Sequence, residues 1–246
     1  MIAMAAALLL STLHQPAGDA APGNDDALRT AIACAPGVLP AHPVTAVRVV
    51  GGETHGEIMF GPGEPLVVNA GTADGVKTGQ RYFVRREVHD PFSFTSAGFP
   101  LIGIHTAGWV TIVDAREHIS VATVTHACDG IIDGDYLEPY TEPAIPPASA
   151  DGTADFAHPA RILMADERRQ MGYAGLLMLI DRGSSQGVRA GQTVTIFRDT
   201  LAGAGPGVTV GRATVLEATP ATALVRIDAS DGPVYVGDLA AIHRIQ

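Results

Sequence analysis

The side chains best suited to bind a metal ion are a histidine and a cysteine two residues apart. His126 and Cys128 follow an apolar stretch and would share one face of a β-strand. Cys34 or His118 could supply a third ligand, but zinc normally takes three or four ligands at defined spacings. Cys34 and Cys128 are the two cysteines of the chain, and an even pair favours a disulfide if the chain is exported, as the apolar residues at its start predict. We therefore predict a Cys34–Cys128 disulfide and no metal site; two buried thiols or a metal site are the alternatives.

A second group of residues has the types needed for nucleophilic catalysis. Ser120 and His118 would lie on one strand face, and Asp114 precedes them. Nothing near them marks an oxyanion hole. The sequence also lacks G-x-S-x-G, H-E-x-x-H, C-x-x-C and Walker-type motifs. We therefore expect no catalytic residues, no cofactor and no enzymatic activity, with a hydrolase of envelope polymers as the alternative.

The dominant pattern of the chain is an internal duplication. The skeleton G-x-x-x-G-V-x-x-G-Q occurs at residues 71–80 and again at 183–192, an offset of 112. A second block at 108–115 matches 211–218 at an offset of 103 and continues to a Gly-Asp pair in each copy. Two gap-free blocks in the same order indicate an ancestral repeat. The change of offset means that the first copy carries nine extra residues between its blocks.

Each copy has the pattern of a small, strand-rich domain. Alternating or β-branched stretches such as residues 121–125 and 193–197 predict short strands separated by Gly or Asp turns. Short strands lose their exposed edges when they close into a barrel or pack as a sandwich. The predicted fold class is mainly β, with two tandem small β-barrels or compact sandwiches and a short N-terminal helix.

The repeated glycines have a backbone explanation in such a fold. Gly71 and Gly183 would end a strand in a turn with positive φ. Val76 and Val188 would plug one end of each barrel. The Asp of each Gly-Asp pair would accept hydrogen bonds from turn N–H groups, and a phosphate-binding loop is disfavoured because no helix follows the glycines. The predicted structural turn motif comprises Gly71, Gly75, Val76, Gly79, Gly134, Asp135, Gly183, Gly187, Val188, Gly191, Gly237 and Asp238.

The domain boundaries follow from local composition. Residues 1–20 form an apolar run that ends in small residues and predicts a cleaved signal peptide, although the usual positive charge at its start is missing. Residues 21–40 contain a short helix. The first repeat spans 41–139, a Pro-rich linker 140–156 and the second repeat 157–246, and both repeats open on Ala-His-Pro. We expect a mature chain without a transmembrane span, exported to the periplasm or cell envelope.

The charge balance narrows the classes of partner. The chain holds 26 acidic and 16 Lys or Arg residues, for a formal charge of −10. Nucleic acids and anionic membranes attract basic surfaces, so neither is an expected partner. Hydrophobic residues make up 46% of the chain, which is too many for a disordered protein.

One connection in the first repeat is unusually aromatic. The expansion between its two blocks contains Phe92, Phe94 and Phe99 among Pro, Gly and Ser residues. Aromatic side chains on a loop often form a binding tip, so these three residues are candidate partner contacts. The alternative is that they fold back over the barrel. We expect Trp109, in the next strand, to lie in the core.

A family resemblance rests on the turn residues Asn69, Gly71, Gly75, Val76, Gly79, Gln80, Arg86, Gly134 and Asp135. This skeleton resembles the small β-barrel at the C-terminus of the flagellar assembly protein T family. It is also similar to repeats in exported bacterial proteins that sometimes carry peptidoglycan-binding LysM modules and, more distantly, to the barrels of the rod-shape-determining protein C. The resemblance covers residues 65–139 and, more weakly, 160–244. It implies a non-enzymatic assembly or scaffold role with an envelope protein or peptidoglycan-associated partner.

Overall fold

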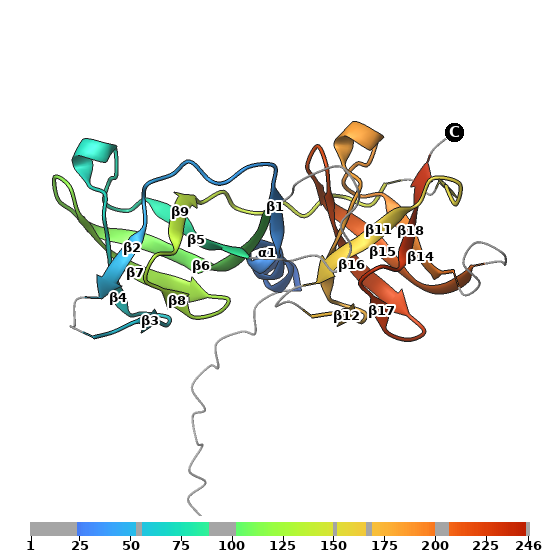
Figure 1. Cartoon of the computed structure of the whole chain (residues 1–246), viewed down its shortest axis with the longest axis horizontal. Helices are drawn as coiled ribbons and strands as arrows, with labels where there is room; N and C mark the ends of the chain where they lie inside the picture. The colour runs from blue at the N-terminus through green and yellow to red at the C-terminus, as the bar shows by residue number, and fades with distance from the viewer. Residues whose placement is uncertain are drawn as a thin grey trace, which may run out of the picture.

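The structure, a computed structural model, describes residues 24–52, 56–88, 102–149, 152–165, 169–199 and 207–244. Two β-barrels lie side by side with a short helix between them (Figure 1). This arrangement confirms the mainly β fold with two small barrels and an N-terminal helix. The predicted signal peptide and the candidate contacts Phe92, Phe94 and Phe99 lie outside the described residues.

The first barrel is built from six strands in the order β2-β4-β7-β6-β5-β9. A bridge between Arg48 and Tyr136 brings the end strands β2 and β9 together. A separate two-stranded ribbon pairs β3 with β8. The bounds are β2 Val49–Gly52, β3 Met59–Phe60, β4 Pro65–Val68, β5 Arg81–Val88, β6 Ile102–Ala115, β7 Ser120–Ala127, β8 Ile131–Ile132 and β9 Tyr136–Pro139, with a 3-10 turn at Thr72–Asp74.

The strands of the second barrel follow the order β18-β11-β13-β16-β15-β14, and the barrel closes by pairing β18 with β14. This is the order of the first barrel, read from β18, which is the equivalent of β9. A short strand, β10, adds to β18, and β12 pairs with β17 in a second ribbon. The bounds are β10 Thr153–Ala154, β11 Ala160–Ala165, β12 Met171–Gly172, β13 Leu177–Ile180, β14 Thr193–Arg198, β15 Val208–Ala218, β16 Ala223–Ser230, β17 Val234–Tyr235 and β18 Leu239–Arg244, with a 3-10 turn at Ser184–Gln186.

The duplication extends to individual hydrogen bonds. The Arg48 N–H donates to Asn69 Oδ1 at 2.7 Å, and the Arg161 N–H donates to Asp181 Oδ1 at the same distance. The two guanidinium groups also donate to the carbonyls of the Gly-Asp glycines. These bonds make Arg48 and Arg161 equivalent at an offset of 113, whereas the two Ala-His-Pro triplets are 116 apart. The connection from the triplet to this arginine is therefore three residues longer in the first repeat, and the opening of both repeats on the same triplet stays a prediction.

Aliphatic side chains fill both barrels. Leu66, Val110 and Ile112 lie in the first interior, and Met178 and Ile196 lie in the second. The alternation of β-strands sends every second side chain inward, which is why each barrel has a single enclosed core.

The two plug residues predicted from the motif are buried in these cores. Val76 is 3% exposed and Val188 is 1% exposed. Each follows a glycine in the left-handed conformation, at φ 85° for Gly75 and φ 80° for Gly187. This confirms the predicted tight turn before the plug.

Gly71 and Gly183 serve a different purpose from the one predicted. Both are extended, at φ −143° and φ −132°, so the expected positive φ is wrong. A Cβ on Gly71 would collide with the carbonyl oxygen of Arg116, and one on Gly183 would collide with that of Thr219. Glycine is required here because two backbone segments approach closely, not because of its own dihedral angles.

Helix α1 (Asn24–Cys34) leads into β1 (Gly37–Leu39), which pairs with the start of β6. The linker after β9 contacts both this helix and the second barrel. The guanidinium of Arg29 donates to the carbonyl of Pro143 at 2.7 Å. Further along, Ile145 packs beside the second barrel and the Ser149 N–H donates to the carbonyl of Gly191 at 2.9 Å. The described part of the linker is therefore anchored at Pro143, Ile145 and Ser149.

Candidate binding site between the barrels

One side of α1 is fastened to the first barrel. Cys34, the last residue of the helix, forms a disulfide with Cys128 just after β7, with Cα atoms 5.6 Å apart. This confirms the predicted pairing. Ala33 packs beside it against Phe83 and Trp109. Trp109 is buried, as predicted, in a core cluster with Ala33 and Phe83 under the helix, and this cluster is separate from the one that fills the barrel interior.

The disulfide also answers the question of a metal site at these residues. Cys34, His126 and Cys128 have ligand atoms within 4.8 Å of one another. The two sulfurs are bonded to each other, so a metal would need a prior reduction to reach thiolates. His118 is not part of this group: it is exposed and lies 3.7 Å from a carboxylate oxygen of Glu117. The arrangement fits a structural crosslink.

His126 stacks on the tryptophan beside the crosslink. The rings of Trp109 and His126 lie 4.3 Å apart at 15°. Burial lowers the pKa of His126 below its usual value, because the imidazolium loses hydration in this position. Trp109 is the single tryptophan of the chain, so its fluorescence reports on this site alone.

We expect the fluorescence of Trp109 to fall on acidification, with a midpoint below pH 6.5, because protonated His126 quenches the stacked indole. In the unfolded chain His126 protonates first, so the folded state loses stability as the pH falls through and below about 6.5. Fluorescence and thermal unfolding between pH 8 and pH 4 measure both effects. The variant His126→Gln should lack the titration; an identical titration in that variant would contradict the assignment.

The opposite side of α1 packs on the second barrel. Leu28 and Ile32 contact an apolar cluster on the outside of that barrel. The cluster comprises Leu163, Met164, Leu177, Leu179, Leu216 and Leu224. The helix is thus bonded to one barrel and buried against the other, and it fixes the seam between them.

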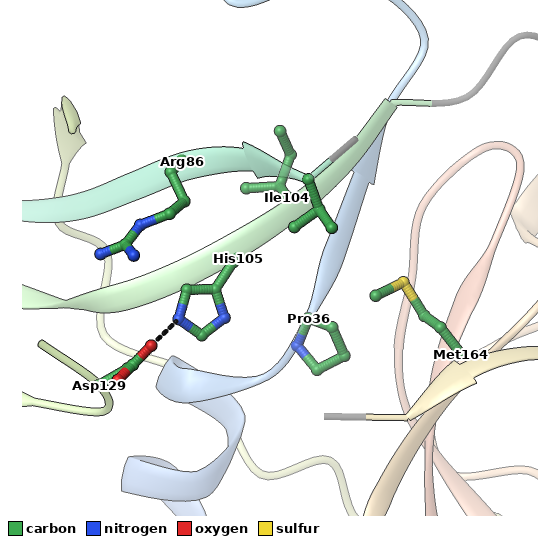
Figure 2. Close-up of a pocket in the computed structure, with 7 residues that line it drawn as sticks. Pro36, Arg86, Ile104, His105, Asp129 and Met164 are labelled. Atoms are coloured by element: carbon green, nitrogen blue, oxygen red, sulfur yellow. Dashed lines mark ion pairs between the residues drawn. The ribbon is translucent and has the colours of Figure 1, made fainter. Parts of the chain in front are cut away.

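A cavity of about 350 Å³ opens at this seam (Figure 2). The first barrel contributes Arg86, Val88, Ile104, His105 and Asp129, the α1–β1 turn contributes Pro36, and the second barrel contributes Met164. This volume is within the range of small-ligand sites. Val88 ends β5, and β6 begins at Ile102, two residues before Ile104, so the end of one strand and the start of the other lie beside this cavity.

The polar group of the cavity is a histidine–carboxylate pair. His105 Nε2 lies 3.3 Å from Asp129 Oδ2, as the dashed line in Figure 2 shows. The orientation does not make a hydrogen bond, so buried Nε2 has no hydrogen-bond partner. None of the seven lining residues is Ser, Thr, Cys or Lys. The described lining can therefore bind a polar ligand or transfer a proton, and it holds no hydroxyl, thiol or amine nucleophile.

Arg86 borders the cavity but is already committed to the fold. Its Nε and Nη2 donate to the two oxygens of Asp135 at 3.0 and 2.9 Å, and Nη2 also donates to the carbonyl of Gly130. Asp135 is buried and also accepts from the Ile132 N–H at 3.0 Å. Burial raises the pKa of Asp135, and the Ile132 N–H and the guanidinium of Arg86 oppose that rise.

The second barrel contains the same ion pair. Arg198 Nε and Nη2 each donate to Asp238 at 2.7 Å, and the hydrogen bond raises the pKa of Arg198. The prediction that the motif Asp accepts turn N–H groups is confirmed, since Asp238 accepts from the Tyr235 N–H at 2.8 Å. The bidentate Arg–Asp pairs themselves were missed. Their signal was present, because Arg and Asp recur in both copies at the repeat offsets.

The residues considered for nucleophilic catalysis do not meet. Ser120 is buried and donates to the carbonyl of Ala70 at 2.7 Å. Asp114 accepts a hydrogen bond from Arg116 at 3.0 Å, and His118 lies beside Glu117. Each side chain is engaged elsewhere, so the structure assembles no Ser–His–Asp site from them.

No family model matches the chain, and no curated protein matches it significantly. No helix among the described residues has the length and apolar character needed to cross a membrane.

Proposed function

We propose that this protein is an exported, non-catalytic scaffold of the bacterial cell envelope, whose two barrels act as one binding platform. The observation that carries the proposal is the double attachment of α1. One side of the helix is crosslinked to the first barrel through Cys34, and Ile32 on the other side is buried against the second. Such an attachment keeps two surfaces at a set orientation, which suits a protein that positions partners.

Three further observations support this role. The disulfide is compatible with an oxidising compartment outside the cytoplasm. Apolar side chains fill both barrel interiors, so binding falls to the outer walls, the loops and the seam. The sequence resemblance to flagellar assembly protein T and related envelope proteins points to assembly or peptidoglycan-associated partners.

A co-sedimentation assay tests the proposal against the hydrolase alternative. The purified, oxidised chain is incubated with peptidoglycan sacculi and, separately, with envelope membranes from a bacterium. We expect it to sediment with one of these fractions and to release no soluble fragments. Release of soluble muropeptides, or a chain that stays in the supernatant with both fractions, would contradict the scaffold role.

A further inference from the structure

The face of the second barrel that receives α1 has a counterpart on the first barrel. The strand pairings identify this counterpart. Gly51 pairs with Val67 in the first barrel, and Met164 pairs with Leu179 in the second, so Gly51 is equivalent to Met164 and Val67 to Leu179. The partner of Val67 in the next strand is Val121, in the position of Leu224. The residues of the first barrel equivalent to the α1-contacting cluster are Val50, Gly51, Pro65, Val67, Val113 and Val121.

This counterpart is apolar but open. Val50 is 47% exposed and Val113 is 49% exposed, whereas their equivalents Leu163 and Leu216 are 4% and 5% exposed. Ile119, in the turn before β7, adds a further side chain that is 42% exposed. Strands β2, β4 and β7 lie at the left of Figure 1, at the end of the molecule away from the second barrel. Among the described residues, one copy of the repeat therefore has this face covered by a helix, and the other has no segment over it.

We propose that the uncovered face is the docking site for an amphipathic helix of a different protein. We call it the β2–β4–β7 face, defined by Val50, Pro65, Val67, Val113, Ile119 and Val121. The inference rests on the proposed scaffold function and names the class of its partner. Exposed apolar patches on the surface of a folded protein commonly mark interaction sites.

The occupant of the equivalent face indicates what fits. On the second barrel that occupant is α1, which presents Leu28 and Ile32 one helical turn apart. On the first barrel, valines replace leucines and Gly51 replaces Met164, so the surface is shallower. A partner helix with bulky side chains at this spacing would fill the extra volume.

A head-to-tail second copy is a poorer occupant. The wall of the first barrel that receives α1 is aromatic, with Phe83, Trp109 and Tyr140. The equivalent wall of the second barrel carries Thr195, Arg212 and His243, and Thr195 Oγ1 lies 2.8 Å from His243 Nε2. That wall is polar. In a head-to-tail assembly it would therefore not offer a second chain the aromatic contacts that the first barrel offers α1. A partner of different sequence is therefore favoured.

A titration followed by methyl NMR tests the proposal on the full oxidised chain. The probe is a synthetic peptide of residues 24–39 with Cys34→Ser, alone and with the additional change Ile32→Phe. We expect shift changes at the methyl groups of Val50, Val113 and Ile119, and a lower Kd for the bulkier peptide. Val113→Asp should abolish these changes, while Val208→Asp, at a residue that is 53% exposed in the second barrel, should not.

Other outcomes overturn the proposal. Shift changes confined to the α1-contacting leucines of the second barrel would mean that the peptide only displaces α1. The absence of any shift change would mean that the face binds no helix. Dimerisation of the free chain that Val113→Asp removes, measured by ultracentrifugation, would assign the face to a second copy. Trp109 fluorescence checks that each variant folds, and Val50→Lys serves as a second variant. The sedimentation assay of the scaffold role is independent of all these results.

Discussion

Reduction of the Cys34–Cys128 disulfide is expected to lower the free energy of unfolding of the first barrel by roughly 4–5 kcal/mol. The bond closes a loop with a sequence separation of 94 residues, and the chain-entropy model assigns about that value to a loop of this size. It also holds α1 against the first barrel. Urea unfolding followed by Trp109 fluorescence, with and without a reductant, isolates this barrel because the second barrel has no tryptophan.

The matched control is the double variant Cys34→Ser with Cys128→Ser. It should be as unstable as the reduced wild type and insensitive to the reductant. Equal stability of the oxidised and reduced chains would show that the crosslink is not structural. Stoichiometric zinc uptake by the reduced chain, with recovery of stability, would favour the metal site as the role of these cysteines.

Removal of one partner from the Arg86–Asp135 pair is expected to destabilise the first barrel by about 3–5 kcal/mol, because a buried charge then lacks its counter-ion. The side chain of Asp135 is 2% exposed. Its raised pKa means that the folded chain holds the carboxyl proton more tightly than the unfolded chain. The folded state therefore loses stability as the pH rises and this carboxyl ionises. Arg86→Met should therefore be more harmful at pH 7 than at pH 4.5.

A double-mutant cycle with Arg86→Met and Asp135→Asn, measured by urea unfolding, gives the coupling energy of the pair. The control is Asp114→Asn, which breaks the pair with Arg116 in the same barrel. That pair is exposed, at 70% and 52%, and its loss should change stability by less than about 1 kcal/mol. Similar effects at the buried and exposed pairs would contradict the structural role of Asp135.

The same ion pair occurs in both barrels, which indicates that its role is structural. Arg86 and Arg198 hold the Gly-Asp turn of each copy in the same way, although only Arg86 borders the seam cavity. His105 and Asp129 have no counterparts in the second barrel, where Val208 and Gly232 stand at the repeat positions. Features shared by the copies maintain the fold, and features that differ between them are where binding is to be sought.

The sequence alone determined the features that depend on local backbone and on register. Gly75 and Gly187 predicted tight turns, the constant offsets predicted two equivalent barrels, and the even cysteine pair predicted the crosslink. These properties are local or repeat along the chain, so patterns of residue type are sufficient to reveal them.

Only the tertiary structure decided what each outward side chain contacts. The sequence did not show that Gly71 avoids the carbonyl of Arg116, or that Trp109 lies under α1 rather than inside the barrel. Leu216 and Val113 occupy the same repeat position, yet one is buried by the helix and the other is exposed. Their difference arises from where α1 and the two barrels sit relative to one another, and contacts between such distant segments leave no periodic signal in the chain.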